Sequence, residues 1–536
     1  MYDCIIVGAG HNALVCACDL AQRGWKVLVL ERRPLVGGCC VTEEPWPGYM
    51  VSTAAYVVSL LLPDIERDLD LERHGYKVLP RNPSSFTPLE DGRYLLLGPD
   101  GDSNRREIAK FSTRDADAYP RYEALLTRIA EHLEPILSHT PVDPLPLPDS
   151  WRHTSLLHKL KAGKDALGLL GTLRGLGDDL PEALEMLAGP AKTILDRWFE
   201  SDVLKGTLAT DAIIGTFQPP SAPGTAYVLL HHVMGSSGGA RGVWGYVQGG
   251  MGGLSNALAA AARERGVEIR TNAAVERIVV HGGNASGVQL ASGEMLSART
   301  VASCVDANQT FLRLVGDAHL PEGFTRAVQR IDYASASLKI NLAVRELPDF
   351  ACLRGTDIGP QHRGTIHIGA TPEYIERAYD DAKYGEPSQH PVIEMTIPST
   401  VDRTLAPPGH HVISMFVQYA PYRLAKGDWD ACKDEFADRC IAEVARYAPN
   451  FPASIVHRQV LTPVDLERTF GLTGGNIFQG AVSLHQLFNL RPVPGWSDYR
   501  TPVGRLYICG SAAHPGGGVM GACGRNAARE MLRDGR

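Results

Sequence analysis

Residues 2–31 carry the pattern that most restricts how this 536-residue chain can fold. An apolar run at residues 4–7 predicts a buried strand, and the turn Gly8-Ala9-Gly10 follows it directly. Residues 14–21 are mostly apolar with helical spacing, and residues 25–30 form a second apolar strand that ends at Glu31. A strand, a Gly-x-Gly turn, a helix, a strand and an acidic residue about 20 positions past the turn make up the dinucleotide-binding βαβ unit.

Each position of this unit has a physical role in holding a diphosphate. Gly8 allows the tight turn, and Gly10 lets the backbone approach a pyrophosphate. The first helical turn presents free N–H groups and the positive end of the helix dipole to the phosphates. Glu31 is placed to accept hydrogen bonds from the hydroxyls of an adenosine ribose. The residues expected to bind the dinucleotide here are Gly8, Ala9, Gly10, His11, Asn12 and Glu31.

The residues after Glu31 favour FAD over NAD. Arg32 follows the acid, and the pair Gly37-Gly38 comes a few residues later, which resembles the extended motif of glutathione-reductase-type FAD proteins. The glycine cluster at 249–253 is not a second fingerprint, because residues 244–247 make a poor buried strand and no acid follows at the required spacing. We therefore predict one non-covalently bound FAD, no NAD domain, and an α/β fold with a Rossmann-like FAD-binding domain.

Charge and cysteine content exclude several other classes of protein. The net charge of −7 argues against general nucleic-acid binding, which needs a basic surface. The 11 cysteines include no Cys-x-x-Cys pair, so we expect reduced thiols in a cytoplasmic protein and no metal site. We also expect no targeting segment, because the first strand begins within the first few residues, and no transmembrane helix. No pattern indicates an oligomeric state.

The middle of the chain is expected to build the substrate side of the protein. Residues 115–240 are predicted to form a mostly helical cap. Within it, residues 155–176 combine leucines with interleaved basic residues. This segment is either a lid helix with a solvated basic face or a helix that lies on a membrane surface and admits an apolar substrate.

An alternating segment at residues 331–344 predicts a strand with one apolar and one polar face. Leu338, Ile340 and Leu342 fall on the first face, whereas Lys339 and Asn341 fall on the second. Lys339 either extends to solvent or points into a cavity, where it would hold a water against the flavin.

The end of the chain also contains a strand that leads into the glycine-rich start of a helix. Residues 506–510 predict a buried strand, glycines follow at 516–518, and residues 523–532 predict a helix. Such a helix N-terminus would stabilise negative charge at the pyrimidine edge of a reduced flavin. The tail residues expected at the cofactor are Gly510, Ser511, Gly518, Val519 and Met520.

These segments resemble a known group of flavoproteins. The stretches IIVGAGHNALV, LVLERRPLVGGCCVTEE, VQGGMGGLSNAL and LYICGSAAHPGGGVMGACGRNAA are similar to those of the phytoene-desaturase and carotenoid-isomerase type, within the flavin amine-oxidase superfamily. The pyridine nucleotide-disulfide oxidoreductase domain-containing proteins of that type are the nearest resemblance. The disulfide in that family name is not supported, because the chain lacks a Cys-x-x-Cys pair.

The resemblance implies a discontinuous FAD-binding domain from residues 1–80, 245–310 and 490–536. Residues 81–244 and 311–489 would form the substrate domain. Lys339 matches the lysine that holds a water near the flavin in the amine-oxidase branch, and Ser511 stands where many relatives carry an acid. By the same resemblance, the residues that contact FAD would be Gly8, Gly10, Glu31, Arg32, Gly38, Val275, Gly510, Val519 and Met520.

Three functions remain open at this point. The first is hydride removal from an apolar or amphipathic substrate to flavin N5, with oxygen or a quinone as electron acceptor, or a redox-neutral isomerisation as a close variant. The second is an amine oxidase that forms hydrogen peroxide and depends on Lys339. The third is a flavoprotein that only binds partners. His514 is a candidate for proton handling and Tyr56 for a place beside the flavin ring, although a lone histidine is more often structural.

Overall fold

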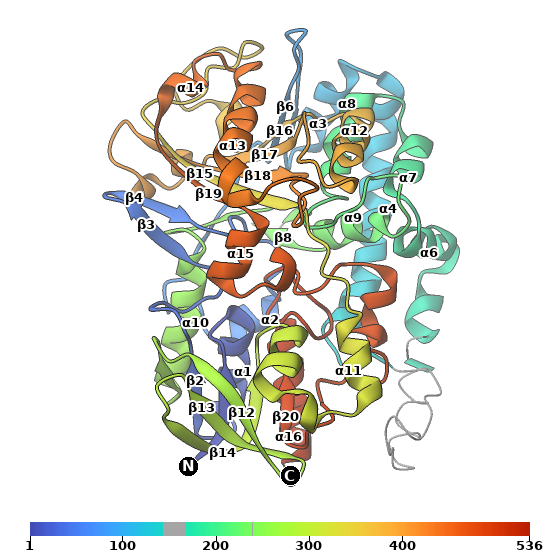
Figure 1. The fold of residues 1–536 in the computed structure, drawn as a ribbon. Coiled ribbons are helices and arrows are strands. Elements are labelled where there is room, and N and C mark those ends of the chain that lie inside the picture. The colour runs from blue at the N-terminus through green and yellow to red at the C-terminus, as the bar shows by residue number, and fades with distance from the viewer. Residues whose placement is uncertain (143–166, 169, 238–239, 536) are drawn as a thin grey trace.

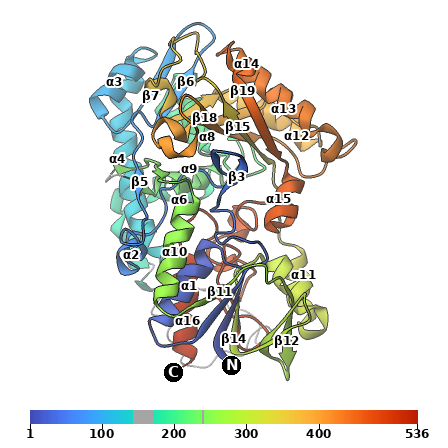
Figure 2. The same ribbon diagram turned by 90° about the vertical axis from the view of Figure 1, so that its left-hand side faces the viewer.

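The computed structural model describes residues 1–142, 167–168, 170–237 and 240–535, and its architecture rests on two seven-stranded sheets. Figure 1 shows the first sheet in the lower half of the molecule, beside both chain termini, and the second sheet in the upper half. Helices cover the flank at the right of that view. Figure 2 shows that the two sheets lie one above the other.

The first sheet has the order β11-β2-β1-β14-β13-β12, with β20 paired to β14. Strands β11, β2, β1, β14 and β20 are parallel, whereas β12, β13 and the first half of β14 form an antiparallel meander. Parallel strands joined through helices make the Rossmann-like arrangement that the sequence predicts. The strands are β1 (Tyr2–Val7), β2 (Val27–Leu30), β11 (Glu268–Arg270), β12 (Val275–His281), β13 (Asn284–Leu290), β14 (Met295–Ser303) and β20 (Leu506–Ile508).

Three helices from distant parts of the sequence pack together against this sheet. α1 (His11–Ala21) lies between α10 (Gly252–Glu264) and α16 (Ala522–Asp534). The close contact of α1 with α16 requires Gly524, because a Cβ there would overlap the Asn12 carbonyl oxygen. The two ends of the chain are therefore joined through a helix pair.

The second sheet has the order β19-β15-β18-β17-β16-β6-β7. The predicted strand at 331–344 begins only at Ser337, and both of its faces are buried. Leu338, Ile340 and Leu342 belong to the apolar core that the sheet shares with α13 (Trp429–Ala445). The other strands are β6 (Ser85–Pro88), β7 (Tyr94–Leu97), β16 (Thr365–Ile368), β17 (Val392–Thr396), β18 (His411–Gln418) and β19 (Ile455–Leu461), beside β15 (Ser337–Val344).

A helical layer covers one flank, in the region where the sequence predicts a cap. It contains α3 (Gly101–Ala109), α4 (Thr113–Leu137), α6 (Leu180–Ala188), α7 (Ala191–Trp198), α8 (Asp202–Thr210) and α9 (Thr225–Val233). Most of the leucine-rich segment 155–176 lies outside the described residues, so its possible membrane contact stays a prediction. Among the described residues, no helix has the length and apolar character needed to cross a membrane.

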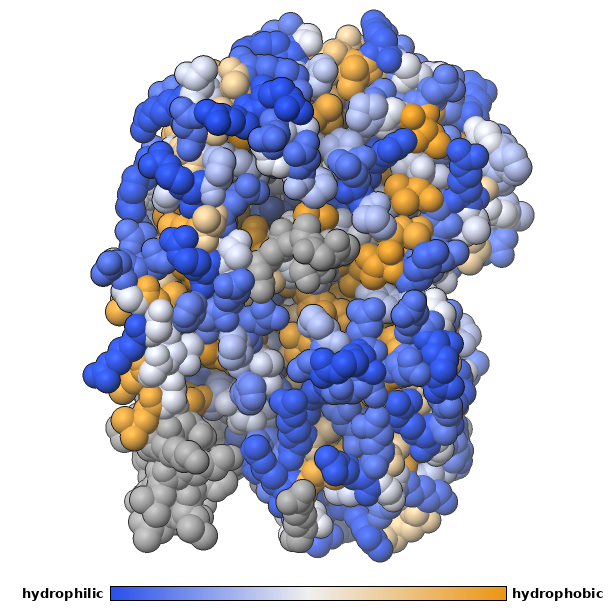
Figure 3. All heavy atoms as spheres, turned by 180° about the vertical axis from the view of Figure 1, so that it is seen from behind, coloured by the Kyte–Doolittle hydropathy of each residue, from blue (hydrophilic) through white to orange (hydrophobic). Residues whose placement is uncertain are grey.

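Shorter elements connect these layers. They are β3 (Thr42–Trp46), β4 (Tyr49–Ser52), β5 (Val78–Leu79), β8 (Ser236–Ser237), β9 (Ala240–Arg241), β10 (Tyr246–Val247), α2 (Pro63–Asp68), α11 (Glu322–Gln329), α12 (Pro372–Lys383), α14 (Phe451–Ser454) and α15 (Pro463–Phe470). Figure 3 shows the molecule from behind, with apolar side chains gathered in the hollow between its upper and lower halves.

Candidate active site

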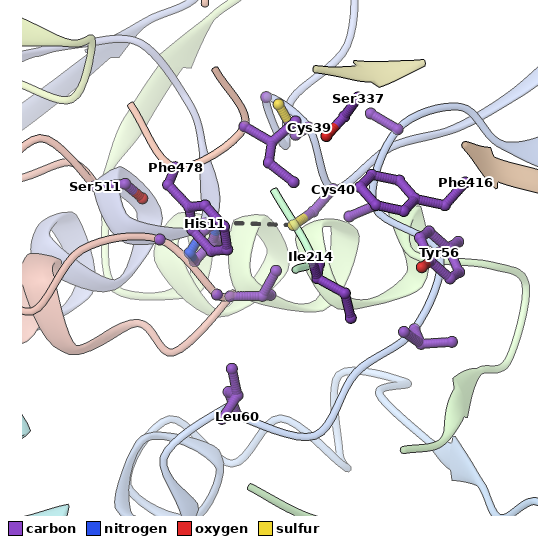
Figure 4. Close-up of a pocket in the computed structure, with 18 of the residues that line it drawn as sticks. His11, Cys39, Cys40, Tyr56, Leu60, Ile214, Ser337, Phe416, Phe478 and Ser511 are labelled. Carbon is purple, nitrogen blue, oxygen red and sulfur yellow. Dashed lines mark hydrogen bonds between the residues drawn. The ribbon is translucent and has the colours of Figure 1, made fainter. Parts of the chain in front are cut away.

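A cavity of about 860 Å³ extends from the glycine turn after β1 to the inner face of the second sheet. Such a volume lies in the range of cofactor and ligand sites. In Figure 4, His11, Cys40 and Ser511 lie toward one side of this cavity, and Tyr56 and Phe416 toward the other. The predicted residues that line it are Gly8, Gly10, His11, Asn12, Glu31, Arg32, Gly37, Gly38, Tyr56, Val275, Lys339, Ser511, Gly518 and Val519.

The first side of the cavity is a cradle made of backbone. α1 begins after Gly10 without a side-chain cap, so the N–H groups of its first turn face the cavity unpaired by a capping side chain. Gly10 and Gly37 form a β-bridge, and Gly37 N–H donates to the Ala9 carbonyl oxygen at 2.8 Å. Gly37 has φ +121°, and a Cβ there would overlap the Cys40 carbonyl oxygen. Only glycine permits this approach of the two turns.

Glu31 fixes the shape of this cradle. Its Oε2 accepts a hydrogen bond from Ala9 N–H at 2.9 Å, and its Oε1 accepts one from Arg33 N–H at 2.9 Å. A carboxylate has about four acceptor sites, so capacity for a ligand hydroxyl remains. The Glu31 carboxylate therefore fixes the backbone N–H of Ala9, and Ala9 itself does not line the cavity.

The two arginines after Glu31 have different environments. The Arg32 guanidinium donates to the Thr469 carbonyl oxygen at 2.6 Å, which ties β2 to the end of α15. Arg33 pairs with Glu43 at 2.7 Å and lies 4.9 Å from the centre of the Phe470 ring. Both arginines line the cavity, and α15 covers this part of it. The sequence singled out Arg32 only, although the same Glu-Arg-Arg run contains Arg33.

The chain tail meets α1 at the middle of the cavity. Asn12 Nδ2 donates to Ser511 Oγ at 3.3 Å. α16 begins after Gly521 without a side-chain cap, and Val519 beside it has φ +61°, a strained conformation for a β-branched residue. Gly510 does not line the cavity; a Cβ there would overlap the Cys304 carbonyl oxygen, so this glycine serves the packing of β20 against the turn after β14.

Unsatisfied polar atoms along the cradle fit a polar ligand such as FAD. His11 Nε2, Asn12 Oδ1 and Arg33 Nη1 are buried without a hydrogen-bond partner among the residues that the structure describes. Buried polar groups are almost always paired, so these three indicate a ligand that completes them. Burial lowers the pKa of His11 to about 4, so the imidazole is neutral and can donate or accept. Its Nδ1 and the Cys40 Sγ are hydrogen-bonded over 3.7 Å (Figure 4).

The far side of the cavity has aromatic walls and buried ionisable groups. Lys339 Nζ lies 3.9 Å from the centre of the Tyr56 ring and donates to Ser414 Oγ. Burial holds the pKa of this lysine well below its usual range, because the site disfavours the charged ammonium. Tyr56 stacks on Phe416 with ring centres 6.1 Å apart, and its hydroxyl donates to Glu394 Oε2 at 3.1 Å.

Comparison with known proteins identifies the family. Residues 14–532 match the model of the family described as flavin containing amine oxidoreductase. The chain belongs to this family. A putrescine oxidase triple mutant has the same fold, with a TM-score of 0.60 and 17% identity over 99% of this chain and 98% of that one. The fold and FAD predicted from the sequence are thereby confirmed, and this flavin-containing oxidoreductase acts on a small molecule and passes electrons to an acceptor.

Two curated relatives match this flavin-containing oxidoreductase over nearly its whole length. Pyridine nucleotide-disulfide oxidoreductase domain-containing protein 2 of Rattus norvegicus is 48% identical over 99% of this chain and 94% of its own length. A phytoene desaturase (lycopene-forming) of Pseudescherichia vulneris is 24% identical over the full length of both chains. The resemblance drawn from the sequence motifs is therefore confirmed. All 11 cysteines of this oxidoreductase are free thiols.

Four predicted site residues of this flavin-containing oxidoreductase lie outside the cavity: Ala9 and Gly510, described above, and His514 and Met520. His514 is fully buried, and its Nε2 donates to the Ile136 carbonyl oxygen at 3.1 Å. Burial lowers its pKa to about 4, and its ring contacts Phe488. Met520 packs in the core of the helical layer. His514 does not line the cavity, and its role in proton handling stays a prediction.

Several cavity residues have no motif in the sequence. The oxidoreductase brings Arg81, Asp211, His367 and Glu394 together from four separate elements. Arg491 lies behind the cavity and donates to the Ser511 carbonyl oxygen at 2.8 Å and to the Phe478 carbonyl oxygen at 2.6 Å. These residues are isolated polar positions in the sequence, so no local spacing could have linked them.

Proposed function

We propose that this oxidoreductase removes a hydride from a C–H bond of an apolar or amphipathic substrate and binds its FAD non-covalently. One observation supports the proposal above the others: the glycine cradle and the aromatic-walled chamber are two parts of the same cavity. The dehydrogenation of phytoene named for one full-length relative is consistent with it. A redox-neutral isomerisation of a double bond is a close variant of this chemistry.

Bound FAD would supply a two-electron acceptor, which oxygen or a quinone would then reoxidise. The residues of the chain have three tasks. The cradle at Gly10, Gly37 and Asn12 holds the cofactor, and Tyr56 with Phe416 orients the substrate above it. Lys339 accepts the proton that the substrate loses with the hydride, because its neutral Nζ has a free lone pair in a site that excludes water. The substrate thus loses two electrons and two hydrogens in balance.

Anaerobic reduction of the purified yellow protein tests the proposal. We expect polyenes or acyl compounds to bleach the flavin absorbance, and air or a quinone to restore it. Bleaching by simple amines, with hydrogen peroxide formed on admission of air, would contradict hydride removal from an apolar substrate and support the second function.

An amine oxidase remains the second candidate because of Lys339. A buried lysine on the long strand of the substrate sheet is the feature that this branch of the family implies. It would hold a water that assists the reoxidation of the flavin. A Lys339→Met variant that reoxidises at the rate of the unchanged protein would remove this support.

A further inference from the structure

Four strands of the second sheet present one row of side chains to the far side of the cavity. Lys339 on β15 is paired with Phe416 on β18, and Phe416 is paired with Glu394 on β17. Glu394 is in turn paired with His367 on β16. Residues directly opposite one another on neighbouring strands project from the same face of a sheet. All four line the cavity, so the strand register places a carboxyl and an imidazole beside the aromatic wall.

Arg81 and Asp211 complete a cluster with this row. Arg81 is held by the Trp244 carbonyl oxygen at 2.6 Å and by Thr365 Oγ1 at 2.7 Å, and it lies 5.3 Å from the centre of the Tyr246 ring. Its guanidinium is therefore fixed without a bidentate carboxylate partner. Asp211 follows α8 and lines the same part of the cavity. We call Arg81, Asp211, His367 and Glu394 the head-group cluster.

The two carboxyls of the cluster retain hydrogen-bonding capacity toward the cavity. Glu394 uses Oε2 for the Tyr56 hydroxyl at 3.1 Å. Its Oε1 is 3.9 Å from His367 Nδ1, which is beyond hydrogen-bond distance. Burial and the charges of Glu394 and Arg81 shift the pKa of Asp211, with no hydrogen bond to its carboxyl among the described residues. Glu394 accepts hydrogen bonds from Tyr56 and Thr210. A carboxyl group has about four acceptor sites, so both acids can still bind a ligand.

The two acids of the cluster are buried near the charge of Arg81, and burial acts on both. Burial, and then the nearby Glu394 charge, raise the pKa of Asp211 to about 8, so its carboxyl is protonated. Burial also raises the pKa of Glu394, but hydrogen bonds from Tyr56 and Thr210 oppose this. The charge of Arg81 favours one ionised acid.

Burial shifts the other ionisable groups near the cluster toward their uncharged forms, including Glu123 on α4, whose pKa it raises. Burial lowers the pKa of His367 to about 3 and holds that of Lys339 well below its usual range. Burial raises the pKa values of Tyr56 and Tyr122, so both phenols stay protonated. The proton of Asp211 is thus available to a ligand, in a cluster that combines one cationic side chain with two acids whose pKa values are raised.

We propose that the head-group cluster binds an uncharged oxygen group, a hydroxyl or a carbonyl, at one end of an otherwise apolar substrate. The Asp211 carboxyl donates to the oxygen of this group, and Glu394 accepts the proton of a hydroxyl. Leu208, Ile214, Leu229 and Phe416 surround the rest of the substrate. This assignment rests on the proposed function, because it specifies which substrates the same cavity selects.

Charged head groups are disfavoured by the same arrangement. An ammonium would lie beside the fixed guanidinium of Arg81, which is a like charge in a site that excludes water. A carboxylate would lie beside Asp211 and Glu394, and burial already raises the pKa of both acids because the site disfavours negative charge. An uncharged oxygen group changes neither the protonation nor the net charge of the cluster.

Three unreactive probes with the same ten-carbon chain test this assignment: 1-decanol, decylamine and decanoate. Their binding to the flavin-loaded protein is measured at pH 7 by calorimetry and by the shift of the flavin absorbance. We expect 1-decanol to bind about tenfold or more tightly than either charged probe. A difference of this size corresponds to one lost charge-assisted hydrogen bond or to one contact between like charges. Tightest binding of decylamine or of decanoate would overturn the proposal.

Variants show whether the probes bind at this cluster. Asp211→Asn keeps an uncharged donor, so we expect its preference for 1-decanol to be retained. Asp211→Asn combined with Glu394→Gln leaves the charge of Arg81 unbalanced, so we expect the preference to change to decanoate. Glu123→Gln, on α4 at the same cavity, is the matched control and should keep the original order. An unchanged order in the double variant would place the probes elsewhere and contradict the assignment.

The outcome of this binding experiment does not depend on whether the protein turns over a substrate. If the double variant does not fold, the order of the three probes on the unchanged protein and on Asp211→Asn still decides the question. Failure of substrates to bleach the flavin, with 1-decanol still preferred, would count against the proposed function alone. Bleaching by polyenes or acyl compounds without any preference for 1-decanol would count against the head-group cluster alone.

Discussion

Asn12 and Ser511, 499 positions apart in the sequence, are joined by a hydrogen bond of 3.3 Å between Asn12 Nδ2 and Ser511 Oγ. Asn12 lies in the first turn of α1, and Ser511 lies in the turn after β20. The contact brings the opposite ends of the chain to the middle of one cavity. A cofactor bound there contacts both ends at once, so its binding should depend on backbone positions in each.

Gly10→Val is expected to abolish flavin binding. A Cβ at Gly10 would meet only the Cys304 Sγ, at 3.7 Å, so the fold should tolerate it, whereas the two further methyl groups of valine would occupy space at the cavity that the phosphates need. We expect the ratio of flavin absorbance to protein absorbance to fall at least about tenfold. Gly323→Val, on an exposed helix turn with open space around it, is the matched control. Equal flavin content in both variants would contradict the cradle.

Arg491→Met is expected to destabilise the protein and loosen its tail. The buried guanidinium donates to the carbonyl oxygens of Ser511 and Phe478, which methionine would leave unpaired. We expect a loss of about 3 kcal/mol or more in the free energy of unfolding, measured by urea denaturation of the flavin-loaded protein. Arg326→Met, which removes an exposed arginine on α11, should change it by less than about 0.5 kcal/mol. An equal loss of unfolding free energy in Arg491→Met and Arg326→Met would contradict this prediction.

Lys339→Met is expected to slow flavin reduction while increasing stability at pH 7. The pKa of Lys339 is lower in the folded protein than in the unfolded chain. At a pH between these two pKa values, the unfolded chain therefore binds one proton more than the folded protein. The contribution of this lysine to stability therefore rises with pH through that window, and the methionine variant lacks this rise. We expect a higher Tm for the variant at pH 7, with the difference shrinking toward pH 10.

The rate of anaerobic reduction separates the chemical role of Lys339 from its effect on stability. Loss of a proton acceptor should slow reduction by about 10²-fold. Unchanged reduction by a substrate that bleaches the parent protein would exclude the proposed base, whatever the Tm shows.

His514→Gln is expected to leave the chemistry almost unchanged. His514 donates to the Ile136 carbonyl oxygen from outside the cavity, and glutamine keeps an N–H donor at a similar reach. We expect the rate of flavin reduction to stay within about twofold and its pH profile to keep its shape. A large rate loss at unchanged flavin content and Tm would restore the role in proton handling that the sequence suggested.

The sequence by itself determined the two cofactor-binding ends of the chain. The β1–α1–β2 unit and the strand, glycines and helix of the tail are contiguous, so local periodicity and turn chemistry define them without any distant contact. The same reasoning distinguished FAD from NAD. It could not decide between Arg32 and Arg33, because their different partners, the end of α15 and Glu43, are set by packing.

Only the tertiary structure decided the composition of the far side of the cavity. The order and register of β15, β18, β17 and β16 place Lys339, Glu394 and His367 in one row, and α8 adds Asp211. It also showed that the polar face of β15 is buried and that His514 is not among the residues that line the cavity. Long-range strand pairing depends on the packing of the whole chain, so isolated polar residues gain their roles only when the two sheets have formed.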